Sequence, residues 1–156
     1  MRGSGVTDST QAPRAWPENL PVRQVRVARP TDRLEAVTSF YRDGLGLAEL
    51  FRFEDHDGYS GIMLGLPGAA YHLEFTHHAG GSPGQAPTRD NLLVLYFDGD
   101  DAVCQVARRL EAHGGTEVVA ENPYWTDRRA VTIEDPDCVA ISHPSFFADL
   151  EALCRA

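Results

Sequence analysis

The sequence predicts an α+β protein built from two similar β-α-β-β-β halves, and two observations support this prediction. The hydrophobic patterns run strand, helix and three strands up to a Gly- and Pro-rich stretch at 79–89, and the same order then repeats. When the sequence is aligned with itself so that Val25 matches Val94, Gly46 also matches Gly115. Neither half could cover both faces of its own sheet. We therefore expect the halves to form a curved mixed sheet with outer helices and a concave cavity.

The first half contains one predicted helix between a first strand and three later ones. Asp32 and Glu35 are spaced as a capping box, which predicts that the helix begins at this point. Apolar residues follow at helical spacing, and Gly44 and Gly46 end the helix. The predicted strands of this half are 22–28, 48–53, 60–66 and 71–76.

The second half repeats the pattern with a longer helix. Its apolar positions fall on one helical face, and Gly114 and Gly115 stop it. The predicted elements are a strand at 92–97, the helix at 102–113, strands at 116–119, 130–134 and 139–143, and a short helix at 146–154.

The chain reads as one domain after an N-terminal tail. Residues 1–20 are rich in Gly, Ser, Thr and Pro and lack periodicity, so we expect a flexible tail. The 156-residue length and the 42% apolar fraction suit a single domain over 21–156. Its halves are predicted at about 21–78 and 90–145.

Composition excludes several classes of partner. The formal charge of −9 disfavours binding to nucleic acid or to an anionic membrane surface. No apolar run is long enough for a membrane span, and the N-terminus lacks the apolar core of a signal peptide, so we expect cytoplasmic residence. The three cysteines form no CxxC pair, so neither a disulfide framework nor a thiolate zinc site is indicated.

Polar residues occupy one face of two predicted strands. His72 and Glu74 share a face of the fourth strand, and Gln24 and Arg26 share a face of the first. Such side chains in central strands need partners or water. Either Arg26 and Glu74 pair and fix the sheet, or Arg26, His72 and Glu74 line a ligand pocket on its concave side.

Aromatic residues suggest a rim for such a pocket. Asn122, Tyr124 and Trp125 lie on a predicted loop before the seventh strand, and Tyr96 could join them. Aromatic rings at a cavity mouth stack on flat or apolar ligands. The alternative is that these rings cap the open end of the core.

Three motifs resemble those of the vicinal-oxygen-chelate superfamily, which includes glyoxalases, bleomycin-resistance proteins and extradiol dioxygenases. They lie in the expected order along about 22–143 and are Phe40-Tyr41 with Gly44-Leu45-Gly46-Leu47, His72-Leu73-Glu74-Phe75, and Glu134-Asp135-Pro136-Asp137. Further motifs, among them Ala28-Arg29-Pro30-Thr31 and Asn122-Pro123-Tyr124-Trp125, resemble an uncharacterised bacterial branch. Members commonly form homodimers, and the resemblance implies the same here.

The resemblance also implies where a metal would bind. Metal-dependent members hold a divalent ion with four side chains, and the corresponding positions here are Val22, Glu74, Asn91 and Ser142. Only Glu74 matches, and Asn and Ser are weak ligands. We therefore expect no standard metal site and no cofactor. A non-standard site would have to use His72, His77, His78, Glu74 and Glu134.

The resulting functional hypothesis is a metal-independent small-molecule-binding protein of the bleomycin-resistance type. The alternative is a glyoxalase-like lyase or isomerase in which Glu74 is the catalytic base, with or without a non-standard metal. A third hypothesis is a dimeric domain without a ligand. The polar residues on the inward strand faces argue against this third one.

Overall fold

The computed structural model describes residues 22, 25–66, 69, 71–82, 84, 91–97, 99–127, 130–138 and 140–143. The predicted tail, the predicted helix at 146–154 and most of the linker at 79–89 lie outside the described residues.

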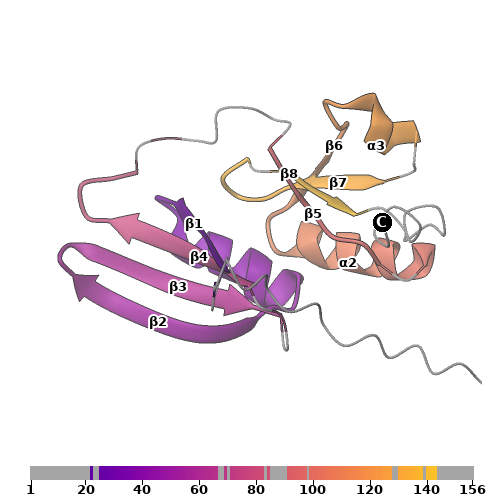
Figure 1. The fold of residues 1–156 in the computed structure, drawn as a ribbon. Coiled ribbons are helices and arrows are strands. Elements are labelled where there is room, and N and C mark those ends of the chain that lie inside the picture. Colours follow the sequence, from indigo (N-terminus) through magenta and orange to yellow (C-terminus); the bar gives the residue numbers. More distant parts are fainter. Residues whose placement is uncertain are drawn as a thin grey trace, which may run out of the picture.

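The described elements form two modules of the same order (Figure 1). The first module consists of β1 (Val25–Pro30), α1 (Leu34–Thr38), η1 (Ser39–Gly44), β2 (Ala48–His56), β3 (Tyr59–Gly65) and β4 (Tyr71–His78). The second consists of β5 (Leu92–Val94), α2 (Asp100–Ala112), β6 (Thr116–Val118), α3 (Pro123–Asp127), β7 (Val131–Glu134) and β8 (Ala140–His143).

Each module contains one four-stranded mixed sheet. The strand orders are β1-β4-β3-β2 and β5-β8-β7-β6, so the two sheets have the same topology. The first strand of each module pairs in parallel with the last, and the other pairs are antiparallel. The predicted α+β fold of two β-α-β-β-β modules is confirmed.

Several predicted boundaries were wrong. β1 begins at Val25 rather than at 22 and continues to Pro30, because its last residues pair with β4 up to Thr76. A proline is compatible with this position because β1 is an edge strand of its sheet. β5 is only three residues long, and the predicted loop around Trp125 forms the short helix α3, which begins at Pro123.

The predicted capping box does not form. Arg33 is the N-cap residue of α1 and makes no side-chain capping hydrogen bond. The Oδ1 atom of Asp32 instead accepts a hydrogen bond from the backbone N–H of Ser82 at 2.7 Å. The backbone N–H of Arg33 donates to Thr31 Oγ1 at 2.9 Å. The spacing was compatible with a cap, but Asp32 joins the helix start to the segment after β4.

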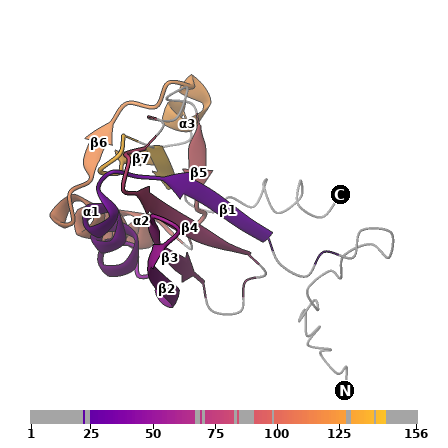
Figure 2. The same ribbon diagram turned by 90° about the vertical axis from the view of Figure 1, so that its left-hand side faces the viewer.

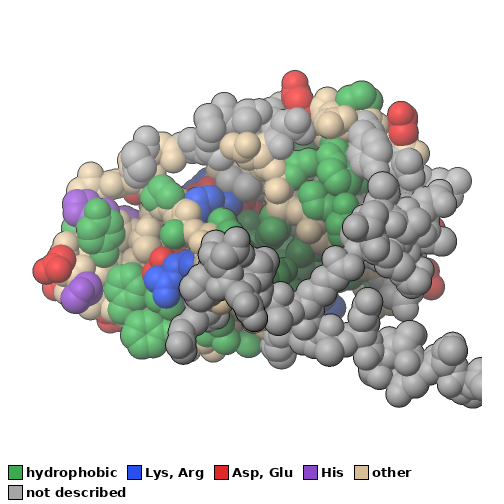
Figure 3. All heavy atoms as spheres, in the orientation of Figure 1, with side chains coloured by type: hydrophobic (Ala, Val, Ile, Leu, Met, Phe, Trp, Pro, Cys, Tyr) green, Lys and Arg blue, Asp and Glu red, His purple; other side chains and the backbone are tan. Residues whose placement is uncertain are grey.

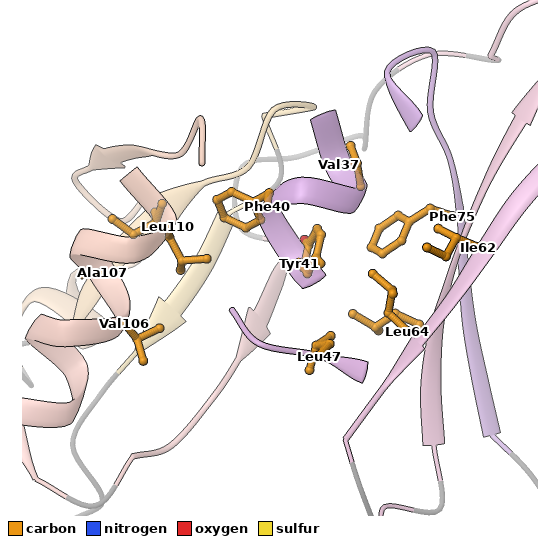
Figure 4. Close-up of a cluster of buried hydrophobic side chains, with 12 residues drawn as sticks. Val37, Phe40, Tyr41, Leu47, Ile62, Leu64, Phe75, Val106, Ala107 and Leu110 are labelled. Atoms are coloured by element: carbon orange, nitrogen blue, oxygen red, sulfur yellow. The ribbon is translucent and has the colours of Figure 1, made fainter. Parts of the chain in front are cut away.

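A wider helical turn continues α1. In η1, the N–H of Leu45 donates to the carbonyl of Phe40, five residues earlier, at 2.9 Å. Two consecutive aromatic residues, Phe40 and Tyr41, lie in this π-type turn. Phe40 points toward α2 and Tyr41 points toward the first sheet (Figure 4).

The core therefore extends through both modules. Figure 4 shows Phe40 and Tyr41 between α2 on one side and β3 and β4 on the other. The buried residues include Val37, Phe40, Tyr41, Ile62, Leu64, Phe75, Val106, Leu110 and Ile133. The α1–η1 segment lies beside α2 in both ribbon views (Figures 1 and 2), and η1 contacts α2.

Two glycines permit this close approach. A Cβ atom on Gly44 would lie 3.2 Å from the Cβ atom of His113, and one on Gly115 would lie 2.7 Å from Phe40 Cε2. Side chains at these positions would push η1 and α2 apart. Among the described residues, no helix is both long and apolar enough to span a membrane.

Candidate functional site

Three polar side chains meet on the face of the first sheet that is turned away from α1. Arg26 on β1 is opposite His72 on β4, and Glu74 follows two residues later on the same face. The Nε atom of Arg26 donates to Nε2 of His72 at 2.9 Å, and its Nη1 atom lies 3.3 Å from both carboxylate oxygens of Glu74. We call Arg26, His72 and Glu74 the polar triad.

The triad carries almost no net charge. Since His72 accepts the hydrogen bond through Nε2, its proton is on Nδ1 and the imidazole is neutral. Arg26 is positive and Glu74 is negative, so their charges compensate. The side chain of Glu74 is 11% exposed, whereas that of Arg26 is 44% exposed. A ligand above this face would therefore meet the guanidinium first.

An apolar surface adjoins the triad. Arg26 reaches across β4 so that its Nη2 atom lies 3.4 Å from Sδ of Met63 on β3. Met63 pairs with Glu74 on one side and with Phe51 of β2 on the other, which places all three on one face. Phe51 is 56% exposed. The open face is thus polar over β1 and β4 and apolar over β2 and β3.

Phe53 extends the apolar half. Its ring lies against Gly61, where an added Cβ atom would be 2.6 Å from Phe53 Cζ. The rings of Phe51 and Phe53 are stacked with centroids 6.4 Å apart and planes inclined by 27°. Together the two rings give the open sheet face an apolar aromatic surface, which we call the aromatic platform. Figure 3 shows hydrophobic and histidine side chains near the end of the first sheet where β2 turns into β3.

A second polar cluster joins the modules. Asp135, in the turn between β7 and β8, accepts hydrogen bonds at Oδ2 from the Arg29 guanidinium and from the Tyr41 hydroxyl, the latter at 2.8 Å. The Arg29 guanidinium also lies over the Phe75 ring, 5.0 Å from its centroid. The side chain of Asp135 is fully buried. Its partners come from the first module, so this cluster fixes the modules together.

Burial changes the acid–base behaviour of this second cluster. Burial raises the pKa of Tyr41 far above its usual value, and the nearby charge of Asp135 raises it further. Burial lowers the pKa of Arg29, but Tyr41 and Asp135 more than compensate, so its pKa is raised. Tyr41 therefore stays protonated and Arg29 stays charged, which suits a structural role.

Clefts also lie between the modules. One of about 600 Å³ is bordered by Val27, Arg29, Tyr41, Tyr71, Leu92 and Leu93, among others. Another of about 440 Å³ includes Tyr71 and Tyr96. The predicted site residue Tyr96 is thus placed near the residue that precedes His72. The structure does not assign Tyr96 to the polar triad.

The remaining predicted residues belong to the second module. Asn122 immediately precedes α3, and Trp125 lies within this helix, which follows β6 in the second module (Figure 1). The side chain of Tyr124 lies outside the described residues. Of the predicted set, the structure brings Arg26, His72 and Glu74 together. A cavity shared with Trp125 stays a prediction.

Comparisons with known proteins identify the relationships of the chain. Residues 25–76 match the model of the YycE-like N-terminal domain, and residues 90–141 match that of the YycE-like C-terminal domain. The uncharacterized protein YycE of Bacillus subtilis is 46% identical over 114 residues, which cover 73% of this chain and 81% of YycE.

The chain belongs to the YycE-like family, within the vicinal-oxygen-chelate superfamily. A crystal structure of YycE from Bacillus subtilis, described as a protein of unknown function, superposes with a TM-score of 0.75 at 42% identity and covers 81% of this chain and 92% of that one. Arg29 lies within the matched N-terminal domain and Asp135 within the matched C-terminal domain. Their hydrogen bond therefore connects the two domains.

More distant structures share the fold alone. The trypanothione-dependent glyoxalase I of Leishmania major has a TM-score of 0.64 at 15% identity and covers 86% of this chain and 94% of its own. The fosfomycin resistance protein FosX of Mesorhizobium loti has a TM-score of 0.60 at 12% identity, with 85% and 96% covered. These likenesses do not transfer an activity to a YycE-like chain.

The residues present do not fit the divalent ion that the superfamily implies. Val22 offers no donor atom, and both carboxylate oxygens of Glu74 contact Arg26, whose positive charge opposes a cation there. Among the described residues, no group of three or more His, Cys, Asp or Glu side chains is arranged to hold a metal.

Sequence reasoning missed the apolar half of the open face. Met63, Phe51 and Phe53 lie there, and no motif indicates them. A strand with Phe51 and Phe53 two residues apart places both rings on one face, but the face is fixed only by pairing with Met63 and Gly61. That register is a property of the folded sheet.

Proposed function

We propose that this YycE-like protein binds a small organic ligand on the open face of its first sheet. The observation that carries the proposal is the adjacency of the polar triad and the aromatic platform of Phe51 and Phe53 on one face of the sheet. Arg26 and Phe51 are exposed on this face, whereas His72 and Glu74 are buried. Ligand sites are mostly apolar with a few convergent polar groups, and this face has that composition. The ligand is held without chemical change, as in the bleomycin-resistance type.

A binding role is favoured over the enzymatic alternative by the surroundings of Glu74. A general base must take up a proton in the reaction. Here the guanidinium of Arg26 lies 3.3 Å from both carboxylate oxygens and occupies the space beside them. Proton abstraction by Glu74 in a lyase or isomerase would have to displace or weaken this contact. We also propose that binding requires no divalent ion.

The proposal extends to assembly and location. Members of the superfamily commonly pair, and we propose a homodimer, for which sedimentation at several protein concentrations is the test. We also propose that the protein resides in the cytoplasm.

The site can be tested through Met63. The chain has only two methionines, Met1 and Met63, so isotope-labelled methionine methyl groups give two signals in a nuclear magnetic resonance spectrum. A library of small aromatic compounds is screened for those that raise the melting temperature. We expect the stabilising compounds to shift the Met63 signal and to leave the Met1 signal unchanged.

Two variants locate the binding. Phe51→Ala removes half of the aromatic platform and should abolish the Met63 shift. Val119→Ala is the matched control, because Val119 is an exposed apolar residue (86%) that follows β6 in the other module. Compounds that stabilise the protein without moving the Met63 signal would show that the ligand site is elsewhere and would refute the proposal.

A further inference from the structure

The open face is divided into an apolar half and a polar half, and this division limits the ligands that fit. The three side chains Phe51, Met63 and Glu74 follow one another across β2, β3 and β4. Adjacent strands are about 4.8 Å apart, so this row spans roughly 10 Å. A fused two-ring compound laid across it would cover Phe51 and Met63 and end above Glu74 and Arg26.

The hydrogen-bonding groups at the polar end form a donor–acceptor pair. The Nη2 group of Arg26 faces the weak acceptor Sδ of Met63, so it retains N–H groups for a stronger acceptor. The carboxylate of Glu74 contacts Arg26 only at 3.3 Å and retains acceptor capacity. A ligand that carries an acceptor beside a donor can satisfy both groups at once.

The charge of the triad adds a second restriction. Arg26 and Glu74 compensate one another, and His72 is neutral in this arrangement. An anionic ligand would gain from Arg26 but would be repelled by Glu74, and a cationic ligand would meet the reverse. A charged ligand that displaced Arg26 or Glu74 from the other would leave a partly buried charge unpaired.

Resting on the proposed function, we infer that the site selects planar, uncharged compounds that carry a carbonyl next to an N–H or O–H group. The ring lies on Phe51 and Met63. The carbonyl oxygen accepts from Arg26 and the neighbouring N–H or O–H donates to Glu74. Arg26 and Glu74 are then the residues that determine specificity.

Four probes of similar shape test this inference. Carbostyril is an uncharged two-ring lactam with adjacent C=O and N–H groups. Quinaldate is the carboxylate of the same ring system, N-methylquinolinium is its cation, and quinaldine lacks the donor–acceptor pair. Affinities are measured by calorimetry and the site is checked by the Met63 methyl signal. Carbostyril should bind at least about tenfold more tightly than each of the others, since hydrogen bonds to charged groups are lost or opposed.

Charge-changing variants make the test specific. Glu74→Gln keeps an acceptor but leaves Arg26 uncompensated, so quinaldate should gain about tenfold while carbostyril changes little. Arg26→Gln leaves Glu74 uncompensated, so N-methylquinolinium should gain and carbostyril should lose affinity. Arg52→Gln is the matched control, because Arg52 pairs with Glu35 of α1 on the opposite side of the sheet. Circular dichroism confirms that each variant is folded.

Different outcomes would overturn the specificity for uncharged compounds and the binding of a ligand on this face. If carbostyril and quinaldate bind equally and both shift Met63, and if neither Glu74→Gln nor Arg26→Gln changes their ratio, the inference is wrong and the binding function stands. If none of the four compounds moves the Met63 signal, the result counts against the inference and the proposed function together.

Discussion

Arg29 on β1 and Asp135 in the turn between β7 and β8 are 106 residues apart in sequence, yet their side chains form a buried ion pair. The carboxylate has no exposed surface, and Tyr41 donates to the same oxygen. A buried charge is tolerated only with such compensation. The ion pair therefore ties the correct placement of one module to that of the other.

The first prediction concerns this ion pair. Asp135→Ala leaves the largely buried Arg29 guanidinium with only the longer ion-pair contact to Asp137, at 3.9 Å, and should lower the free energy of unfolding by up to about 3–5 kcal/mol in urea titrations. Asp43→Ala is the control, since Asp43 pairs with Arg42 on the exposed surface and its removal should change stability little. Equal effects of the two variants would contradict a structural role for Asp135 at the module junction.

The second prediction follows from the raised pKa of Tyr41. The unfolded chain releases this proton near the ordinary value of 10.0, whereas burial keeps it on in the folded chain. The contribution of Tyr41 to stability is thus complete below about pH 10 and is lost as the pH rises toward its folded pKa. The loss should approach about 1.4 kcal/mol per pH unit.

Tyr41→Phe isolates this contribution. The variant should be less stable than the wild type at neutral pH by about 1 kcal/mol, because one hydrogen bond to Asp135 is lost. The difference should shrink above pH 10 and change sign within about one further pH unit, because only the wild type loses stability through Tyr41. The ultraviolet absorbance change of the native protein between pH 9 and 11 should be the same with and without Tyr41. A smaller change in the variant would mean that Tyr41 ionises normally.

The fold was largely predictable because it depends on patterns that repeat. The element order and the glycines at the helix ends recur in each half, so two modules could be read from apolar periodicity. Periodicity could not show whether the capping box forms, because the side chain of Asp32 accepts a hydrogen bond from the backbone of Ser82, 50 residues later. Likewise, nothing in the local sequence distinguishes the π-type turn at Phe40 from an ordinary helix end.

The candidate site was predictable only in part, for the same reason. Strand alternation placed Arg26, His72 and Glu74 on one face, and they do contact one another. The contribution of Met63 depends on the register between β3 and β4, which alternation alone does not give. The role of Asp135 was also missed, since its motif indicates a turn and not the distant partner Arg29.

The third prediction separates the two interpretations of the triad. The Arg26–Glu74 pair is partly exposed, so screening limits its value to about 1 kcal/mol. Glu74→Gln should therefore unfold at a slightly lower urea concentration and retain the native circular dichroism spectrum. The decrease in its free energy of unfolding should be much smaller than the decrease in Asp135→Ala. An unfolded Glu74→Gln protein, with no compound able to shift the melting temperature of the wild type, would make Glu74 a structural partner of Arg26.

The fourth prediction concerns metal. Elemental analysis of protein purified without added metal or chelator should give far less than one zinc, nickel, manganese or iron per chain, because Arg26 occupies the position of a cation beside Glu74. Ligand affinity should not change after treatment with a chelator. A stoichiometric ion that disappears in Glu74→Ala would overturn this prediction and would favour the enzymatic alternative.

The last prediction concerns Trp125. If the aromatic residues near α3 border the same cavity as the triad, in one protomer or across a homodimer, a ligand on Met63 must also alter the surroundings of Trp125. The chain has two tryptophans, Trp16 and Trp125, so their indole N–H signals can be assigned with Trp16→Phe.

Carbostyril should shift the Trp125 indole signal with the same concentration dependence as the Met63 methyl signal. Phe51→Ala should remove both shifts together, because both report one binding event. Dilution adds a further distinction: if the cavity is completed by a second copy, the Trp125 response weakens once the dimer dissociates, whereas a cavity within one protomer is unaffected. A Met63 shift with an unchanged Trp125 signal would restrict the site to the first sheet and assign Trp125 to the packing of the second module.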